Sequence, residues 1–161
     1  MKNKDLRAVL EAHMILQSEN LYVVGSARNI VELRNQFKNL TETENILYKK
    51  DSTEVWAYEK TDSNLLSSLV PVKDKNGGYV KLDENRQLKE GEMAYTCHPD
   101  ELADLGKNIE ELHMQEVDIS NLSKFDTKSL ENKENSGWFA KNENFAWAFQ
   151  VLKEFGFFKD I

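Results

Sequence analysis

The pair Cys97-His98 carries the side chains with which this chain could perform nucleophilic chemistry. It lies where a predicted strand, residues 93–97, gives way to a predicted helix. A thiol near the free N–H groups of a helix start has a stabilised thiolate, and a neighbouring imidazolium would stabilise it further. Consecutive strand residues point to opposite faces, so His98 is poorly placed and His113 would have to act as the base. Because Cys97 continues the apolar face of the predicted strand, we expect a buried, unreactive thiol. An enzyme site at Cys97 and His98 remains the alternative.

A second possible site lies at Gly25–Arg28, between a predicted buried strand at residues 21–24 and a predicted helix. A strand, a glycine and a helix start together can bind an anion, because free backbone N–H groups point at the turn. Phosphate-binding loops carry several glycines, and Gly25 stands alone. Ser26 can serve as a simple helix cap. We therefore interpret this segment as a structural turn and keep a small enzyme site there as an alternative.

The spacing of histidine, cysteine and carboxylate residues predicts no metal site and no cofactor. His98 and His113 are fifteen residues apart, and the sequence contains no Cys-x-x-Cys and no His-x-x-x-His motif. It also contains no nucleophile elbow, Walker loop or dinucleotide fingerprint. His13 falls on the apolar stripe of a predicted helix, where we interpret it as a hydrogen-bonded core histidine.

Residues 83–118 form an acidic block with eleven acidic and three basic side chains. Its net charge of −8 exceeds the −7 of the whole chain. An acidic surface repels phosphate backbones and attracts basic partners, so we expect no direct binding to nucleic acid. The residues expected to contact a partner are Asp100, Glu101, Asp104, Glu110 and Glu111.

The resulting hypothesis is a small acidic accessory or inhibitory protein. Its acidic face would dock on a basic protein surface, such as the nucleic-acid channel of an enzyme. Small proteins of mobile elements, and immunity proteins against toxins, follow this logic by analogy. The competing interpretation is that the acidic residues only keep the fold in solution.

Length and composition set the remaining expectations. The 161 residues suffice for one globular domain, residues 1–161. The single cysteine excludes an internal disulfide, and no apolar run reaches the roughly eighteen residues of a membrane helix. We therefore expect a cytoplasmic protein without membrane contact. Lysine outnumbers arginine seventeen to four, a bias typical of an AT-rich bacterial or viral genome.

Hydrophobic periodicity predicts an α+β fold. Its sheet is expected to be an antiparallel meander of four to five strands, packed against N-terminal helices and an aromatic-rich C-terminal helix. One helix is predicted at residues 4–18, and a second carries Ile30, Leu33, Phe37 and Leu40 on one face. The strands are predicted at residues 45–50, 54–60, 66–72, 79–82 and 93–97.

Two later segments complete this outline. His98-Pro99 has the composition of a helix start, and Gly106 is expected to end that helix. Residues 108–119 fit either a short helix or a last strand. Residues 120–137 contain few apolar side chains and are predicted to form a mobile connection.

The C-terminal stretch, residues 138–158, holds eight of the sixteen aromatic side chains. Apolar residues recur there at steps of three and four, which predicts a helix that is nearly enclosed. Gly156 is well placed to end it. The residues of the predicted inward face are Phe145, Ala148, Phe149, Leu152 and Phe155.

Overall fold

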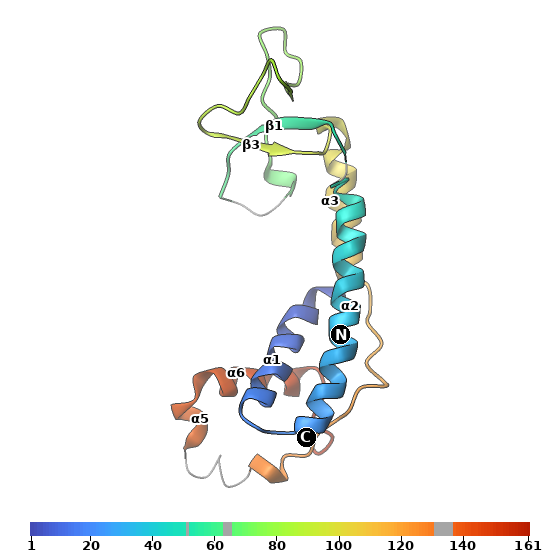
Figure 1. Ribbon diagram of the computed structural model, residues 1–161, viewed down its shortest axis with the longest axis vertical. Coiled ribbons are helices and arrows are strands. Elements are labelled where there is room, and N and C mark those ends of the chain that lie inside the picture. The colour runs from blue at the N-terminus through green and yellow to red at the C-terminus, as the bar shows by residue number, and fades with distance from the viewer. Residues whose placement is uncertain (51, 63–65, 131–136) are drawn as a thin grey trace. The chain divides into compact units, whose positions relative to one another are not determined.

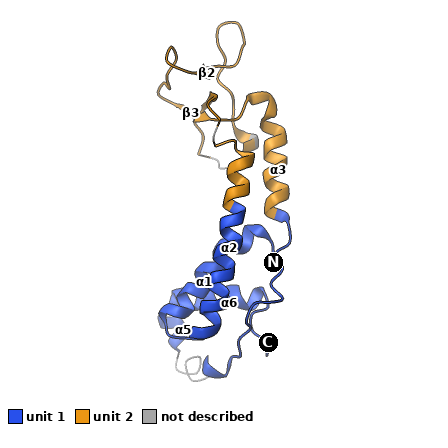
Figure 2. Ribbon diagram, turned by 45° about the vertical axis from the view of Figure 1, so that its right-hand side comes forward, with its two compact units in different colours: residues 1–40, 114–161 blue, residues 41–113 orange. Residues whose placement is uncertain are grey.

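Helices and one small sheet make up the computed structural model, which describes residues 1–50, 52–62, 66–130 and 137–161 (Figure 1). The chain divides into two compact units, which Figure 2 colours separately. Unit 1 comprises Met1–Leu40 and Met114–Ile161, and unit 2 comprises Thr41–His113. Helix α2, Val23–Leu47, contributes residues to both units.

The core of unit 1 forms where helix α1, Leu6–Ser18, packs against helix α6, Glu143–Glu154 (Figure 1). The predicted helix at residues 4–18 is therefore confirmed, with a single 3₁₀ turn, Asn3–Asp5, at its start. Both helices bury one face, as the periodicity predicts. The buried side chains are Leu6, Val9, Ala12, His13 and Leu16 of α1, and Phe145, Ala148 and Leu152 of α6.

Helix α6 ends as the sequence predicts. Gly156 adopts a left-handed φ of 77°. The Phe157 N–H donates to the Leu152 carbonyl over 2.9 Å, and the Gly156 N–H donates to the Lys153 carbonyl over 3.1 Å. This pair of bonds satisfies the last carbonyls of the helix. The expectation that α6 is nearly enclosed is wrong, because Trp147 is 42% exposed and Phe149 is only half-buried.

The predicted strand at residues 21–24 is also wrong, because Val23 and Val24 form the exposed first turn of helix α2. Helix α1 ends at Ser18, and Asn20 then adopts a left-handed φ of 55°. Tyr22 has a φ of 49°, so the chain reverses within three residues. Tyr22 is held there by its ring, which stacks on Phe125 at 4.7 Å, and by its hydroxyl, which donates to the Asp126 carbonyl. A short apolar run does not distinguish a strand from a helix, and tertiary contacts decide here.

His13 is the core histidine that the sequence predicts. It is fully buried, and its Nδ1 lies 2.8 Å from the Val9 carbonyl oxygen. A carbonyl only accepts, so Nδ1 carries the proton and Nε2 accepts from the Asn29 amide at 3.0 Å. Burial lowers the pKa of His13, and the bond to Val9 offsets this only in part. The imidazole is therefore neutral in the folded protein near pH 7.

The connection predicted at residues 120–137 lies partly outside the described residues, because residues 131–136 are not described. Within residues 120–130, Leu122, Phe125 and Leu130 are buried in unit 1. Phe125 also exchanges backbone hydrogen bonds with the C-terminal segment, through Phe157 at 2.7 Å and Lys159 at 2.9 Å. This part of the connection is thus anchored by three apolar side chains and a short backbone ladder. Helix α5, Trp138–Lys141, follows it and precedes α6.

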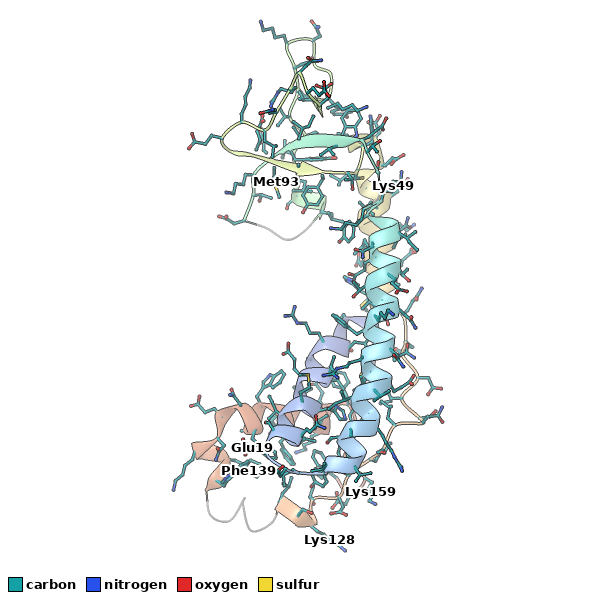
Figure 3. All side chains as sticks on the ribbon, viewed as in Figure 1. Glu19, Lys49, Met93, Lys128, Phe139 and Lys159 are labelled. Carbon is teal, nitrogen blue, oxygen red and sulfur yellow. The ribbon has the colours of Figure 1, made fainter. Side chains whose placement is uncertain are left out.

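Unit 2 contains a three-stranded antiparallel sheet in the order β2-β1-β3. Strand β1 is Val55–Glu59, β2 is Lys81–Leu82 and β3 is Glu92–Tyr95. Side chains of helix α3, Leu102–Met114, and of the sheet share one hydrophobic core, and Met93 of β3, labelled in Figure 3, packs against it. The α+β class is confirmed. The buried core residues are Tyr58, Leu69, Cys97, Leu102, Leu105 and Ile109.

Fewer strands form than the sequence predicts. Residues 45–47 are the end of helix α2, so the first predicted strand is wrong, and the turn predicted beside it includes the undescribed residue 51. Residues 66–68 form a 3₁₀ turn, and Pro71 makes only an isolated bridge to Tyr58. Proline has no N–H to donate, which limits a strand to such partial pairing.

Helix α3, Leu102–Met114, begins after a 3₁₀ turn, Pro99–Glu101, as predicted from His98-Pro99. His98 caps this start, because its Nδ1 accepts from the Asp100 N–H at 3.1 Å. Gly106 does not end the helix. An unbroken stripe of buried residues carries the helix past it, and this resolves the segment at 108–114 as helix. The stripe comprises Leu102, Leu105, Ile109 and Leu112.

The packing of α6 yields a prediction about stability. Phe145 is 1% exposed and lies 4.5 Å from the Trp138 ring, so Phe145→Ala should lower the free energy of unfolding by about 3–5 kcal/mol. Phe149→Ala, at a half-buried position of the same helix, should cost distinctly less. Urea unfolding of both variants measures the difference. Equal losses would show that burial along α6 does not determine stability.

The neutral state of His13 yields a prediction about pH. The unfolded chain binds a proton on His13 near its ordinary pKa of 6.5, whereas the folded chain resists it. Stability is therefore fully present above pH 6.5 and falls below it, by about 1.4 kcal/mol for each pH unit until the lowered folded-state pKa is reached.

Urea unfolding at about pH 7.5 and about pH 5.5 tests this window, which lies above the titration of most carboxylates. His13→Gln cannot be protonated and should lose most of the pH dependence. A proton NMR titration gives a second readout: the His13 ring signals should keep their neutral positions below pH 6.5 in the folded protein. A normal titration of the ring would contradict this assignment.

Candidate functional site

The acidic residues expected to bind a partner all lie at the start of α3 or along it, and all are exposed. Asp100 and Glu101 belong to the 3₁₀ turn, and Asp104, Glu110 and Glu111 belong to the helix. Successive helical residues are about 100° apart, so Asp104 and Glu111, seven residues apart, share a side, whereas Glu110 lies off it. The acidic face is therefore defined as Asp100, Glu101, Asp104 and Glu111.

Burial of the apolar side of α3 fixes the orientation of this face. The stripe that includes Leu105 and Ile109 packs into the core of unit 2, so the carboxylates on the remaining surface must point to solvent. Asp104 and Glu111 thus sit on a regular helix, and Asp100 and Glu101 on the 3₁₀ turn that leads into it. The carboxylates of the face have a fixed spacing before any partner arrives.

The net charge of the chain is concentrated in unit 2. Residues 41–113 carry sixteen acidic and nine basic side chains, a net charge of −7. Unit 1 carries twelve of each sign and is neutral. The whole excess of negative charge therefore belongs to the unit that holds the acidic face.

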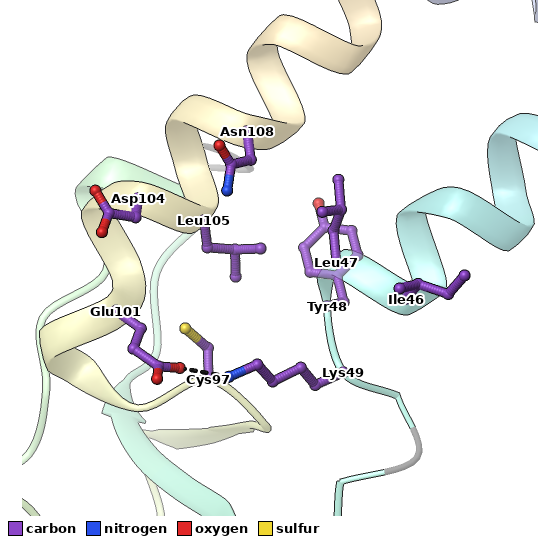
Figure 4. A pocket seen from close by; sticks show the side chains of 9 residues that line it. All are labelled: Ile46, Leu47, Tyr48, Lys49, Cys97, Glu101, Asp104, Leu105 and Asn108. Carbon is purple, nitrogen blue, oxygen red and sulfur yellow. Dashed lines mark hydrogen bonds and ion pairs between the residues drawn. The ribbon is translucent and has the colours of Figure 1, made fainter.

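A pocket of about 330 Å³ lies beside the acidic face, within unit 2 (Figure 4). The end of α2 and the residues after it form one wall, and the first turns of α3 form the other. The lining residues are Ile46, Leu47, Tyr48, Lys49, Cys97, Glu101, Asp104, Leu105 and Asn108. Two members of the acidic face, Glu101 and Asp104, thus line a concave site, and Glu110 and Glu111 do not.

Lys49 crosses this pocket to reach Glu101. Its Nζ lies 2.7 Å from Glu101 Oε2, and both side chains are more than half exposed. The hydrogen bond and the lysine charge lower the pKa of Glu101, and the same contact raises the pKa of Lys49. The chain turns sharply here, because Lys49 has a left-handed φ of 51° and Thr96 Oγ1 donates to the Tyr48 carbonyl over 2.6 Å.

Cys97 lies at the pocket without the surroundings of a nucleophile. It is 4% exposed, and its thiol donates weakly to the His98 carbonyl over 3.4 Å. Burial, followed by the nearby Glu101 carboxylate, raises the pKa of the thiol, and Lys49 opposes this only in part. A raised pKa leaves the thiol protonated at neutral pH.

Neither histidine of unit 2 hydrogen-bonds to the sulfur. The His98 ring lies edge-on to the rings of Trp56 at 4.5 Å and Tyr79 at 5.6 Å. His113 instead approaches Glu44 of α2, with Nε2 2.7 Å from Oε1. The geometry thus provides a buried thiol and no base bonded to it.

Gly25–Arg28 is not a strand-to-helix turn, because all four residues lie within helix α2. Gly25 has a packing role: an added Cβ would lie 2.8 Å from Phe125 Cε1. Ser26 is fully buried, and its Oγ has no hydrogen-bond partner among the residues that the structure describes. The anion site considered from the sequence therefore lacks the strand that it needs.

Sequence reasoning missed the α2 wall of the pocket, namely Ile46, Leu47, Tyr48 and Lys49. Residues 45–50 look like a strand, so nothing suggested that they approach α3. The usable signal was that no glycine or proline interrupts residues 26–50, which allows one helix to continue from residue 23 to the pocket.

Within the described ranges, no three His, Cys, Asp or Glu side chains gather closely enough to bind a metal ion. None of the helices found there has both the length and the apolar character needed to span a bilayer. Comparisons with protein-family models, with curated proteins and with solved structures found no match to this chain.

The burial of Cys97 yields a prediction about reactivity. The native thiol should react slowly with an aromatic disulfide reagent at neutral pH, because it is inaccessible and protonated. The same protein unfolded in urea should react at the rate of an ordinary free cysteine. Fast reaction of the native protein would contradict this and would support the alternative of a nucleophile at Cys97.

Proposed function

We propose that the protein acts by binding, with the acidic face of unit 2 docked on a basic surface of a partner protein. The observation that supports this best is the charge distribution: unit 2 holds the entire net charge of −7, and unit 1 is neutral. Charge that served only to keep the protein in solution would have no reason to gather in one unit. A concentrated negative field accelerates encounter with a positive surface.

The negative field of unit 2 also indicates which kind of partner to expect. Negative potential disfavours direct contact with phosphate backbones, so nucleic acid itself is not the proposed ligand. A protein that handles nucleic acid carries the complementary basic channel, and covering that channel would inhibit it. The proposal is therefore an accessory or inhibitory protein, of the kind found in mobile elements or as immunity to toxins.

We place this encounter in the cytoplasm, because a single cysteine permits no internal disulfide.

A small enzyme remains the second candidate, because Cys97 does line the pocket. The raised pKa of its thiol and the absence of a hydrogen bond from His98 or His113 to the sulfur argue against it. Gly25–Arg28 offers less, because it lies within a helix.

Charge reversal on the acidic face tests the proposal. Asp104→Lys combined with Glu111→Lys should weaken association with a basic partner by about tenfold or more at low salt, and less as salt rises. Stability should hardly change, because exposed charges contribute little to folding. Glu19→Lys combined with Glu154→Lys is the matched control: both residues are exposed in unit 1, and the change in total charge is the same.

Wild type and both variants serve as baits in cell extract. Quantitative mass spectrometry then measures which proteins each bait retains, and how much of each. The retained protein is then measured by surface binding at about 0.05 M and about 0.5 M salt. The expected result is loss of the partner by the unit 2 variant alone. Equal binding by all three baits at both salt concentrations would show that the carboxylates of α3 are only a solvated surface.

A further inference from the structure

The pocket beside the acidic face has a more specific role. We propose that it receives an arginine side chain of the partner, as the anchor of the docked surface. This inference rests on the proposed function and deepens it: the acidic face would attract the partner, and the pocket would fix one of its side chains.

The apolar and polar residues that line the pocket match the aliphatic stem and the guanidinium of an arginine. Leu47 and Leu105 give the walls an apolar surface, against which the aliphatic stem can pack. On the α3 side, Glu101 and Asn108 supply oxygen acceptors to the pocket. The Asp104 carboxylate lies at its outer edge, turned away from Leu47 and Tyr48 in the view of Figure 4. A planar guanidinium can bind one carboxylate with two N–H groups and still donate to a second acceptor. The volume of about 330 Å³ lies at the lower end of the range of ligand pockets and accommodates one long side chain with a few waters.

The carboxylates of the pocket can accept a new cation. Asp104 makes no hydrogen bond or ion pair with any residue that the structure describes. Among the described residues, Glu101 forms an ion pair with Lys49 alone, and both side chains of that pair are more than half exposed. Exposed pairs of this kind contribute little free energy, so a partner's arginine can exchange with Lys49 readily.

The cations of the chain itself already occupy the surroundings of the pocket. Lys49 bonds to Glu101 across it. Lys50 Nζ lies 5.7 Å from the centre of the Tyr48 ring, and that ring also lines the pocket. The contact of Lys49 shows that a positive charge fits in the pocket beside a carboxylate. The contact of Lys50 shows that the Tyr48 ring can hold a second one. Lys49 thus occupies the position that the arginine would take.

Ile46, at the rim of the pocket, adds an independent observation. It is 75% exposed, the highest value among the large apolar side chains that the structure describes as exposed. Single exposed apolar residues are common, but one beside a charged pocket has an evident use when a partner covers it. The aliphatic part of a docked chain would remove Ile46 from water.

The test uses the full chain and the peptide acetyl-Gly-Arg-Gly-amide as probe, with its uncharged citrulline analogue. In an NMR titration, the arginine peptide should shift the backbone amides of residues 46–49 and 101–108, and the citrulline peptide should bind about tenfold more weakly. Asp104→Asn should raise the dissociation constant of the arginine peptide about threefold to tenfold. Glu90→Gln removes one exposed carboxylate of unit 2 away from α3. This control should leave the dissociation constant of the arginine peptide nearly unchanged.

A second variant tests the displacement of Lys49. Lys49→Met keeps the length of the side chain, frees Glu101 and should tighten binding of the arginine peptide about twofold to fivefold. Lys107→Met removes an exposed positive charge from α3 outside the pocket, so it controls for the general change in field. Lys107→Met should change the dissociation constant of the arginine peptide distinctly less than Lys49→Met does. The amide spectra also report that each variant is folded.

The pocket proposal and the acidic-face proposal fail differently. The pocket proposal is overturned if the citrulline peptide binds as well as the arginine peptide. It is equally overturned if Lys49→Met and Lys107→Met change the dissociation constant by the same factor. It is also overturned, with the acidic face intact, if Glu111→Gln weakens peptide binding as much as Asp104→Asn. A lysine peptide that binds as tightly would overturn the assignment to arginine. The acidic-face proposal fails separately, in the capture experiment, if the charge-reversed variant retains as much of the partner as wild type does.

Discussion

Each unit is tied together by one buried polar side chain whose hydrogen bonds join segments far apart in the sequence. In unit 1 the Asn29 amide donates to His13 Nε2 and to the Ser123 carbonyl, and its oxygen accepts from the Ser123 N–H at 2.7 Å. In unit 2 the Tyr58 hydroxyl donates to the Cys97 carbonyl over 2.5 Å. A buried polar group without a partner costs free energy, so each of these bonds fixes one arrangement of its segments. The bond from Tyr58 joins β1 to Cys97, which directly precedes His98, the cap of the 3₁₀ turn that leads into α3. It therefore links the sheet to the segment that carries the acidic face.

The sequence predicts those elements whose signals are local. Helix α1, the start of α3 after His98-Pro99 and the end of α6 at Gly156 all follow from periodicity and capping. Residues 21–24 and 45–50 were mistaken for strands because short runs of branched and aromatic side chains fit either structure. The exposure of the α3 carboxylates follows from the buried stripe opposite them. Their division into pocket residues and outer residues does not, because it depends on the close approach of Lys49 and its neighbours to α3, which no local pattern encodes.

The charges that make the pocket suitable for a cation also make it unsuitable for a thiol nucleophile. A reactive cysteine needs a positive environment that stabilises its thiolate. Burial and the Glu101 carboxylate raise the pKa of Cys97, and only Lys49 lowers it. A binding site for a basic side chain and a cysteine active site are thus competing uses of the same surroundings. The balance of charge favours the first, and it is a reason to expect an unreactive thiol although Cys97 lies at the pocket.

Net charge and shape would contribute differently to recognition by such a protein. A field from seven excess negative charges acts over about 8 Å at physiological salt and attracts any basic surface, so it raises the rate of encounter without selecting a partner. Selection requires a geometry that only some surfaces can satisfy. In the proposed interaction, Glu101 and Asp104 line a cavity that Leu47 and Leu105 also line, so a long side chain with a charged, planar end would bind there better than a diffuse positive patch. Lys49 strengthens this discrimination, because a ligand that cannot replace its bond to Glu101 gains nothing by entering.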